Sequence, residues 1–329
     1  MAVGQRRANR PVDQAMVAGR VPKDVVRSIW MEAVAHHAAL TPDLSQTLYL
    51  TLPGAEGIEI ELLKNAGLIK TTETGAIAAK YAHRIVGIEN SSTALMQIAR
   101  KYPGFKVIRG TVDSYLRGTT LTKYPDGESE AVTRARVVNL DLNETWRAVE
   151  RQNEEWLIPV QRWIQKFSLV HAKAPKIPWT LLLTLHGECP WENHAAQMRE
   201  AFLESVDRID GGQQRVAEWL GHELFNRITA EGFTEFHLLS RIDQQIVLMW
   251  LVPILIAGTC IADGWDIHVA NCLRYGTLPN APMVTWRIDF IPPPQVPRLA
   301  HTQAHRRCVE SLLATGEAIE ENGTIVIKR

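Results

Sequence analysis

The sequence has few cysteines and no excess of either charge. Its four cysteines show neither C-x-x-C spacing nor the spacing of a zinc site, so we expect free thiols in a reducing, cytoplasmic compartment. Thirty-six basic residues balance thirty-six acidic ones, which excludes a general attraction to nucleic acid or to an anionic membrane. Any contact with nucleic acid would therefore involve a local patch.

Long apolar runs are also scarce. The N-terminus is polar and basic, without the apolar segment of a signal peptide, and we expect residues 1–21 to form a flexible tail. The one long apolar run, residues 246–262, is shorter than the ~20 residues of a membrane-spanning helix and contains Pro253 and Gly258. We expect a buried helix there and no contact with a membrane.

Two nucleotide-binding signatures are missing from the turn at residues 53–57, P-G-A-E-G. No G-K-[ST] follows it, which excludes a phosphate-binding P-loop. The G-x-G-x-x-G of dinucleotide enzymes cannot be drawn through Gly54, which argues against that class, the runner-up for this loop. The turn nevertheless joins a strand pattern at 48–52 to a helix pattern at 58–68.

Short apolar strand patterns alternate with helix patterns through the first half of the chain. Strands that are apolar through most of their length and separated by helices indicate a parallel sheet covered on both faces. We therefore predict an α/β fold with a doubly wound, mostly parallel sheet. The predicted strands are residues 48–52, 84–89, 105–109, 136–142 and 179–186, and the predicted helices are 25–40, 58–68, 93–102 and 146–172.

After residue 190 the pattern changes to helices and then to two longer strands. We predict a terminal hairpin of strands 266–274 and 283–291, because the loop between them contains glycine and two prolines. The remaining predicted elements are helices at 193–206, 213–230, 246–262 and 302–317 and a short edge strand at 324–328.

Acidic side chains recur where the predicted strands end. Glu89 ends the second strand, Asp113 follows the third and Asp141 lies at the end of the fourth. Ligands of doubly wound sheets bind beyond the carboxyl ends of the strands, and a carboxylate after the second strand is placed to accept hydrogen bonds from two ribose hydroxyls. The other interpretation of Glu89 is a cap for the helix that starts near Ser92, or a pair with Arg84.

With this run of strands, the terminal hairpin and these strand-end residues, the sequence resembles the class I S-adenosylmethionine-dependent methyltransferases over roughly residues 48–186. The resemblance implies a Rossmann-like methyltransferase fold with a C-terminal helical region, and S-adenosylmethionine as cofactor. It implies no metal. The residues that it assigns are Pro53, Gly54, Glu56 and Gly57 in the cofactor loop, Glu89 on the ribose, Asp113 near the adenine, and residues 139–143 beside the methyl group, with Asp141 and Asn143 as candidate catalytic residues.

The resemblance also suggests how the chain is organised. We expect a tail at 1–21, a lead-in helix at 22–46 and a Rossmann-like cofactor-binding core at 47–190. A helical insertion and the terminal hairpin of the same sheet would occupy 191–291, and a C-terminal tail with a helix and a short strand would occupy 292–329.

The first loop departs from the pattern of that family. The family's acidic-x-Gly-x-Gly-x-Gly aligns with Thr51, Pro53, Ala55 and Gly57, so one of its three glycines is present. Glycine lets the backbone approach a ligand and turn sharply there. Two functions therefore stay open: a methyltransferase acting on nucleic acid, protein or a small molecule, and a catalytically inactive, methyltransferase-like subunit of a larger complex whose C-terminal helical region contacts a protein partner.

Three residues at the end of the fifth strand are further candidates for catalysis or metal binding. Cys189 stands where some RNA cytosine methyltransferases keep a nucleophilic thiol, but a packed thiol explains it as well. His186 and Glu188 suit acid–base chemistry or a metal, although a lone H-x-E pattern is more often a packed or exposed pair.

Overall fold

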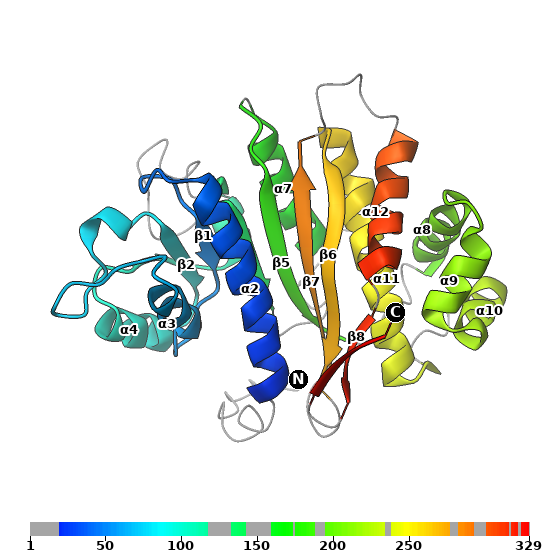
Figure 1. Cartoon of the computed structure of the whole chain (residues 1–329), viewed down its shortest axis with the longest axis horizontal. Helices are drawn as coiled ribbons and strands as arrows, with labels where there is room; N and C mark the ends of the chain where they lie inside the picture. Colours follow the sequence, from blue (N-terminus) through cyan, green and yellow to red (C-terminus); the bar gives the residue numbers. More distant parts are fainter. Residues whose placement is uncertain are drawn as a thin grey trace, which may run out of the picture.

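The chain is built around one sheet (Figure 1). The structure, a computed structural model, describes residues 20–117, 133–142, 159–173, 175–187, 195–233, 238–276, 282–292, 301–315, 317–321 and 324–328. Within these ranges the sheet has nine strands in the order β3-β2-β1-β4-β5-β7-β6-β8-β9. The strands are β1 (Tyr49–Thr51), β2 (Ile85–Glu89), β3 (Lys106–Arg109), β4 (Val137–Asp141), β5 (Trp179–His186), β6 (Asp266–Tyr275), β7 (Met283–Ile291), β8 (Glu317–Glu321) and β9 (Thr324–Lys328).

The strands of the first half of the chain lie next to one another. β3, β2, β1, β4 and β5 pair in parallel, in that order, which confirms that the five predicted strand segments are neighbours. β7 lies between β5 and β6 and is antiparallel to both. The prediction that residues 283–291 pair antiparallel within the sheet is therefore confirmed, and the fold is α/β with a mixed sheet.

The C-terminal end of the sheet differs in part from the prediction. β9 is the edge strand that was expected at 324–328, but β8 pairs with β6 in parallel and was not predicted. The predicted helix at 302–317 is wrong at its end, because the helix stops at Thr315 and Glu317 already belongs to β8. The Thr315 hydroxyl donates to the Val269 carbonyl of β6, 2.7 Å away, so a contact distant in sequence holds the helix end beside the sheet.

Helices precede, connect and follow the strands. The described α-helices are α2 (Arg20–Leu40), α3 (Ile58–Asn65), α4 (Ser92–Lys101), α5 (Val112–Leu116), α7 (Pro159–Ala172), α8 (Ala195–Asp207), α9 (Gly212–Leu220), α10 (His222–Glu231), α11 (Arg241–Cys260) and α12 (His301–Thr315).

Three helix predictions need correction or restriction. The single helix predicted at 213–230 is two helices, because Gly221 adopts φ 92° between α9 and α10, a conformation that a helix interior does not allow. α5 was not predicted, although Thr111 caps it and Ser114 completes a capping box. Of the predicted helix 146–172, residues 159–172 are observed as α7 and the part before residue 159 lies outside the described residues.

Both faces of the sheet are covered. Side chains alternate along a strand, and in β5 Leu181 and Leu183 join one buried cluster with α7 and α11, whereas Leu182 joins a second cluster with α2, α3 and α4. In Figure 1, α2 crosses in front of the sheet while α7 and α11 lie behind it. The predicted burial on both faces is therefore observed for β1, β2, β4 and β5, whereas the edge strand β3 is only partly buried.

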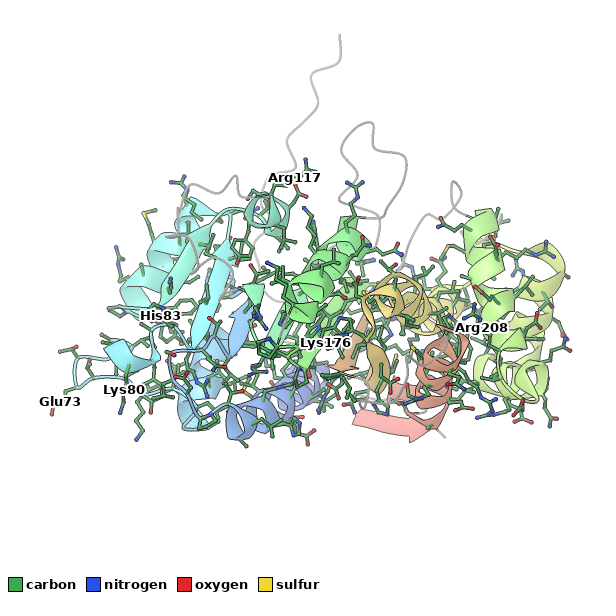
Figure 2. All side chains as sticks on the ribbon, turned by 90° about the horizontal axis from the view of Figure 1, so that it is seen from above. Glu73, Lys80, His83, Arg117, Lys176 and Arg208 are labelled. Carbon is green, nitrogen blue, oxygen red and sulfur yellow. The ribbon has the colours of Figure 1, made fainter. Side chains whose placement is uncertain are left out.

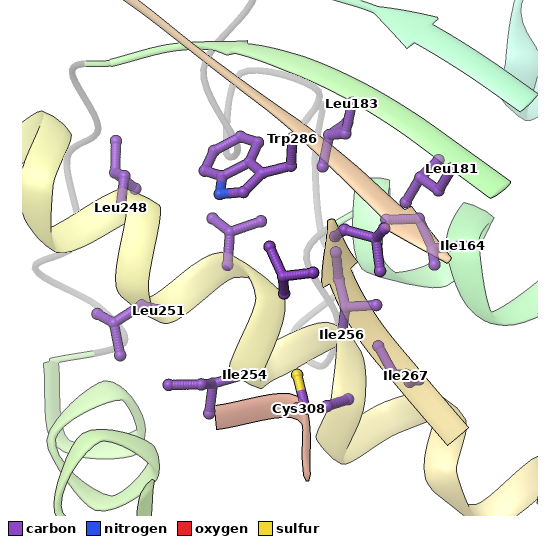
Figure 3. Close-up of a cluster of buried hydrophobic side chains, with 14 of the residues drawn as sticks. Ile164, Leu181, Leu183, Leu248, Leu251, Ile254, Ile256, Ile267, Trp286 and Cys308 are labelled. Atoms are coloured by element: carbon purple, nitrogen blue, oxygen red, sulfur yellow. The ribbon is translucent and has the colours of Figure 1, made fainter. Parts of the chain in front are cut away.

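The most apolar helix, α11, packs in the larger cluster (Figure 3). It is long and apolar enough to cross a membrane, but most of its apolar stretch is buried within the protein, and the predicted buried helix at 246–262 is confirmed. Pro253 has no N–H, which leaves the carbonyl of Met249 without its helical partner. The indole N–H of Trp286 on β7 donates to that carbonyl at 3.2 Å, so the neighbouring strand supplies the missing bond.

Candidate functional site

The strand order reverses direction between β1 and β4. From β1 the chain adds β2 and β3 on one side, and then returns to place β4 on the other. Such a switch point opens a crevice at the carboxyl ends of the strands, where α/β proteins bind ligands. Several polar side chains of β1, β4, α3 and α2 meet at this end, and they form the candidate site.

Asn139 is the most deeply buried member of the site. Its side chain is fully buried in β4, and its amide nitrogen donates to the Tyr49 hydroxyl at 2.7 Å and lies 3.5 Å from the Thr51 hydroxyl, both on β1. Burial raises the pKa of Tyr49 well above its usual value, so the phenol is protonated at neutral pH. The Asn139 carbonyl oxygen has no hydrogen-bond partner among the described residues.

Glu59 adds a buried carboxyl group from the first turn of α3. The residue is 7 % exposed, and its Oε2 has no partner among the described residues. Burial, reinforced by the negative charge of Asp141, raises the pKa of Glu59 to about 7, although its own backbone N–H and the cations Arg27 and Lys23 act in the opposite direction. Near neutral pH, Glu59 therefore exchanges readily between a carboxylic acid and a carboxylate.

Asp141 ends β4 at the open side of this cluster. It is half-buried, and its Oδ2 lies 3.7 Å from the Lys23 ammonium group of α2. The Tyr275 hydroxyl, from the end of β6, is another buried group without a partner in the described ranges, and burial and the charge of Asp141 raise its pKa. Helix α2 thus brings a cation to a strand-end carboxylate.

The predicted cofactor loop makes a tight turn beside β2. Gly54 and Gly57 have φ 57° and 56°, which side chains other than glycine rarely adopt. A Cβ at Gly57 would lie 2.8 Å from the Tyr102 ring, so this glycine also permits close packing. The Pro53 ring packs against Gly87 of β2, and the Glu56 carbonyl accepts a bond from Lys101 at 2.9 Å. The loop is thereby anchored to β2 and α4.

Glu89 ends β2 and already has a local partner. Its Oε1 accepts from the Ser91 N–H at 2.7 Å, next to the start of α4, whose N-cap is Ser91. The alternative pairing with Arg84 is wrong, because that guanidinium group donates to backbone carbonyls at the other end of the strand. Glu89 is half-buried, and its position at the carboxyl end of β2 is the one that the sequence predicted.

Asp113 lies on α5, beyond β3. One carboxylate oxygen pairs with Arg117 at 2.8 Å, and the other is 3.4 Å from the Trp163 indole nitrogen. The predicted site residues Asn143, Glu188 and Cys189 lie outside the described residues. His186 is found at the end of β5, as predicted.

The structure thus brings Asp141 together with residues that the sequence analysis did not single out. Glu59, Tyr49, Tyr275 and Lys23 were missed, and Asn139 was named merely as the start of a range. One signal was available for Glu59: it stands four residues before buried Leu63, on the apolar side of α3. A carboxyl group on that side of a helix needs an explanation other than solvent exposure.

Within the described ranges, no three histidine, cysteine, aspartate or glutamate side chains lie close enough together to hold a metal ion. No protein-family model matches the sequence, and a search of curated proteins finds no significant match. The function is therefore argued from the geometry of the site.

Proposed function

We propose that the protein binds S-adenosylmethionine and is a methyltransferase of the class I type, with a doubly wound Rossmann-like sheet as its core. Five parallel strands followed by an antiparallel strand inserted between β5 and β6 support this proposal, because the resembled family combines parallel strands with a terminal antiparallel hairpin. Fold alone does not determine function, so the proposal rests on the side chains of the site.

The observation that carries the proposal is a pair of buried oxygen acceptors at the switch point. Glu59 Oε2 and Asn139 Oδ1 are both buried, and both lack a donor among the described residues. An unpaired buried acceptor costs about 1–3 kcal/mol, so a ligand that supplies N–H donors or positive charge would be favoured here. S-adenosylmethionine carries both, as an ammonium group and a sulfonium centre.

The other predicted residues have compatible positions around this pair. We assign the ribose hydroxyls to Glu89, the neighbourhood of the adenine to Asp113, and the backbone of the turn at Pro53, Gly54, Glu56 and Gly57 to the cofactor loop. For Glu89 to hold a ribose it keeps the Ser91 bond on Oε1 and uses the other oxygen, since a carboxylate has about four acceptor positions.

Methyl transfer requires little of the protein beyond placing the acceptor in line with the methyl group. The bound cofactor supplies an electrophilic methyl group, which an acceptor nitrogen or oxygen takes up as its bond to sulfur breaks. Asp141, with its charge at the open side of the site, would orient the N–H or O–H of the acceptor and receive the proton that it loses. Asn143 is the second candidate for this role. The acceptor is a nucleic acid, a protein or a small molecule.

Calorimetric titration of the full chain with S-adenosylmethionine and with its demethylated product tests this proposal. We expect both to bind, and Glu59→Gln to weaken binding at least tenfold at pH 8, where Glu59 is ionised. Affinity of the wild type should rise through pH 7 because ionised Glu59 attracts the ammonium group, whereas the variant should show no such rise. Glu73→Gln, at an exposed position labelled in Figure 2, is the matched control. Failure of the wild type to bind either molecule would refute the proposal that S-adenosylmethionine is the cofactor.

A second candidate function is a subunit that does not catalyse methyl transfer. It is favoured by the bond between Glu89 and Ser91 and by the loss of two family glycines from the loop. In this case the helical region of α8, α9 and α10 would contact a protein partner in the cytoplasm. Binding of the demethylated product together with no methyl transfer to nucleic acid, protein or small-molecule acceptors would favour this candidate.

A further inference from the structure

A hollow of about 440 Å³ lies among α7, α8, α11 and α12. Its volume is within the ~300–1,000 Å³ range of small-molecule sites. It adjoins the C-terminal part of α11. The short 3₁₀ helix that follows α11 (Ile261–Asp263) ends at Asp263, whose carbonyl accepts a bond from Lys176 just before β5. The hollow therefore lies toward the amino end of β5, whereas the candidate cofactor site lies at the carboxyl ends of β1 and β4.

His305 of α12 lines this hollow with a largely buried imidazole ring. Its side chain is 4 % exposed, and Nδ1 has no partner among the described residues. Burial, and then the nearby charge of Arg208, lower the pKa of His305 to about 4. The ring is thus neutral at physiological pH, and one of its nitrogens is an acceptor.

The other polar groups of the lining include two carboxylates and the oxygen of Gln161 as acceptors, together with the donors of Arg208 and Gln197. Gln161 of α7 uses its amide nitrogen to bond the Leu255 carbonyl and the Thr259 hydroxyl, which leaves its oxygen as an acceptor. Glu204 of α8 pairs with Arg208, but Glu200, one turn earlier on the same helix, adds a carboxylate. The charged groups of the lining therefore carry one more negative than positive charge.

Gly258 of α11 borders the hollow and keeps it open. A Cβ built on this residue would have no heavy atom within 4 Å, so the space beside the helix is empty. Glycine inside a helix costs roughly 0.5–1 kcal/mol relative to alanine, and its φ here does not require glycine. The absence of a side chain at this position therefore has the effect of preserving the hollow.

We propose that the hollow is a second ligand site, which binds a small organic ammonium ion. The ammonium group would lie between Glu200, the Gln161 oxygen and His305, and the aliphatic body of the ligand would lie on Ile254, Leu255 and Ile261. This site is independent of the proposed cofactor, because no residue of its lining belongs to the carboxyl end of the sheet.

Titration of the full chain with pentylammonium, followed by ligand-observed NMR and calorimetry, tests the site. We expect saturable binding with a dissociation constant of about 1 mM or lower, and much weaker binding of pentan-1-ol and pentanoate, which share the chain but lack the positive charge. S-adenosylmethionine should leave the affinity unchanged.

Two variants and a control locate the binding. Gly258→Leu fills the hollow and improves helix propensity, so it should fold and abolish binding. Glu200→Gln, at an exposed position, should weaken binding about three- to fivefold. Glu218→Gln removes an exposed carboxylate of α9 outside the hollow and should have no effect. Absence of saturable binding, equal binding of pentanoate, or unchanged binding by Gly258→Leu would overturn the proposal.

Discussion

The buried polar side chains at the two ends of the parallel strands differ in their hydrogen bonding. At the amino end, the Arg84 guanidinium group donates to three backbone carbonyls, those of Thr41, Asp43 and Gln46, at 2.6, 3.0 and 3.4 Å. At the carboxyl end, Glu59 and Asn139 each keep an oxygen for which the described part of the chain supplies no donor. Buried polar groups are normally paired. Arg84 Nε and His37 Nδ1 at the amino end also lack a partner within the described residues, so the difference is that the unpaired atoms at the carboxyl end include a carboxylate oxygen, which the proposed cofactor would bond.

The amino end of β5 and the end of β4 differ in a similar way. At the amino end of β5, the Thr180 hydroxyl donates to Asp289 at 2.6 Å and meets His37 Nε2 at 2.8 Å. The hydroxyl has a single hydrogen, so His37 donates through Nε2. Because burial lowers the pKa of His37 to about 4, the ring is neutral at pH 7 and carries its proton on that nitrogen. The Asp289 carboxylate there is bonded by Thr180 and Arg287, whereas Asp141 at the carboxyl end lies 3.7 Å from Lys23 and adds its charge to that of Glu59.

Arg84→Met should have the largest effect on stability. It removes three charge-assisted bonds to the segment before β1. The Thr41 and Gln46 carbonyls lose their donor, whereas the Asp43 carbonyl keeps the Gln46 N–H, so we expect the free energy of unfolding to fall by about 3–5 kcal/mol. Urea unfolding at pH 7 measures the change, and affinity for S-adenosylmethionine should be the same as in the wild type. A loss below about 1 kcal/mol would mean that the amino end is not held by these bonds.

The second prediction concerns acid sensitivity at the amino end. Burial lowers the pKa of His37 from 6.5 to about 4, so between these values the unfolded chain binds more protons than the folded chain. The stability due to neutral His37 is complete above pH 6.5 and is lost as the pH falls to 4, by about 3 kcal/mol. His37→Gln keeps a donor for Thr180 and should lose correspondingly less. His171 and His305 titrate in the same range, so equal slopes in both proteins would count against the contribution of His37.

At the carboxyl end the sign of the pH dependence is reversed. The pKa of Glu59 is raised from 4.5 to about 7, so the folded chain binds the extra proton and stability falls as the pH rises across that interval. Glu59→Gln should therefore increase the free energy of unfolding by about 2–3 kcal/mol at pH 8 and leave it unchanged at pH 4. Thermal unfolding at the two pH values measures this. A variant that is destabilised at pH 8 would show that Glu59 has a structural partner.

The smallest expected change in stability belongs to Glu89→Ala. It removes one bond to the Ser91 N–H, while the Ser91 hydroxyl still caps α4, so unfolding of the ligand-free protein should change by about 1 kcal/mol or less. Affinity for S-adenosylmethionine should fall at least tenfold, because one or two charge-assisted bonds to the ribose are lost. If the wild type binds and this variant binds equally well, the cofactor lies elsewhere.

Much of the sheet was predictable because its strands are locally apolar. The runs around β1, β2, β4 and β5 are buried on both faces, and such runs indicate parallel strands whatever their partners are. β3, at the edge of the sheet, is only partly buried. The end of β4 was also predictable as a polar site, since Asp141 follows an apolar strand. The break at Gly221 was missed because a glycine within a helix pattern is often tolerated.

The sequence by itself determined which segments are strands, apart from β8, that α11 is buried, and that carboxylates stand at the strand ends. The tertiary structure alone decided which polar groups meet: Asn139 with Tyr49, Lys23 with Asp141, and Glu59 beside that carboxylate. It also decided that β7 lies between β5 and β6 and that a hollow opens beside Gly258. Burial of apolar runs follows from local pattern, whereas the partner of a buried polar group is set by strands and helices that lie far apart in the sequence, by 90 residues for Asn139 and Tyr49.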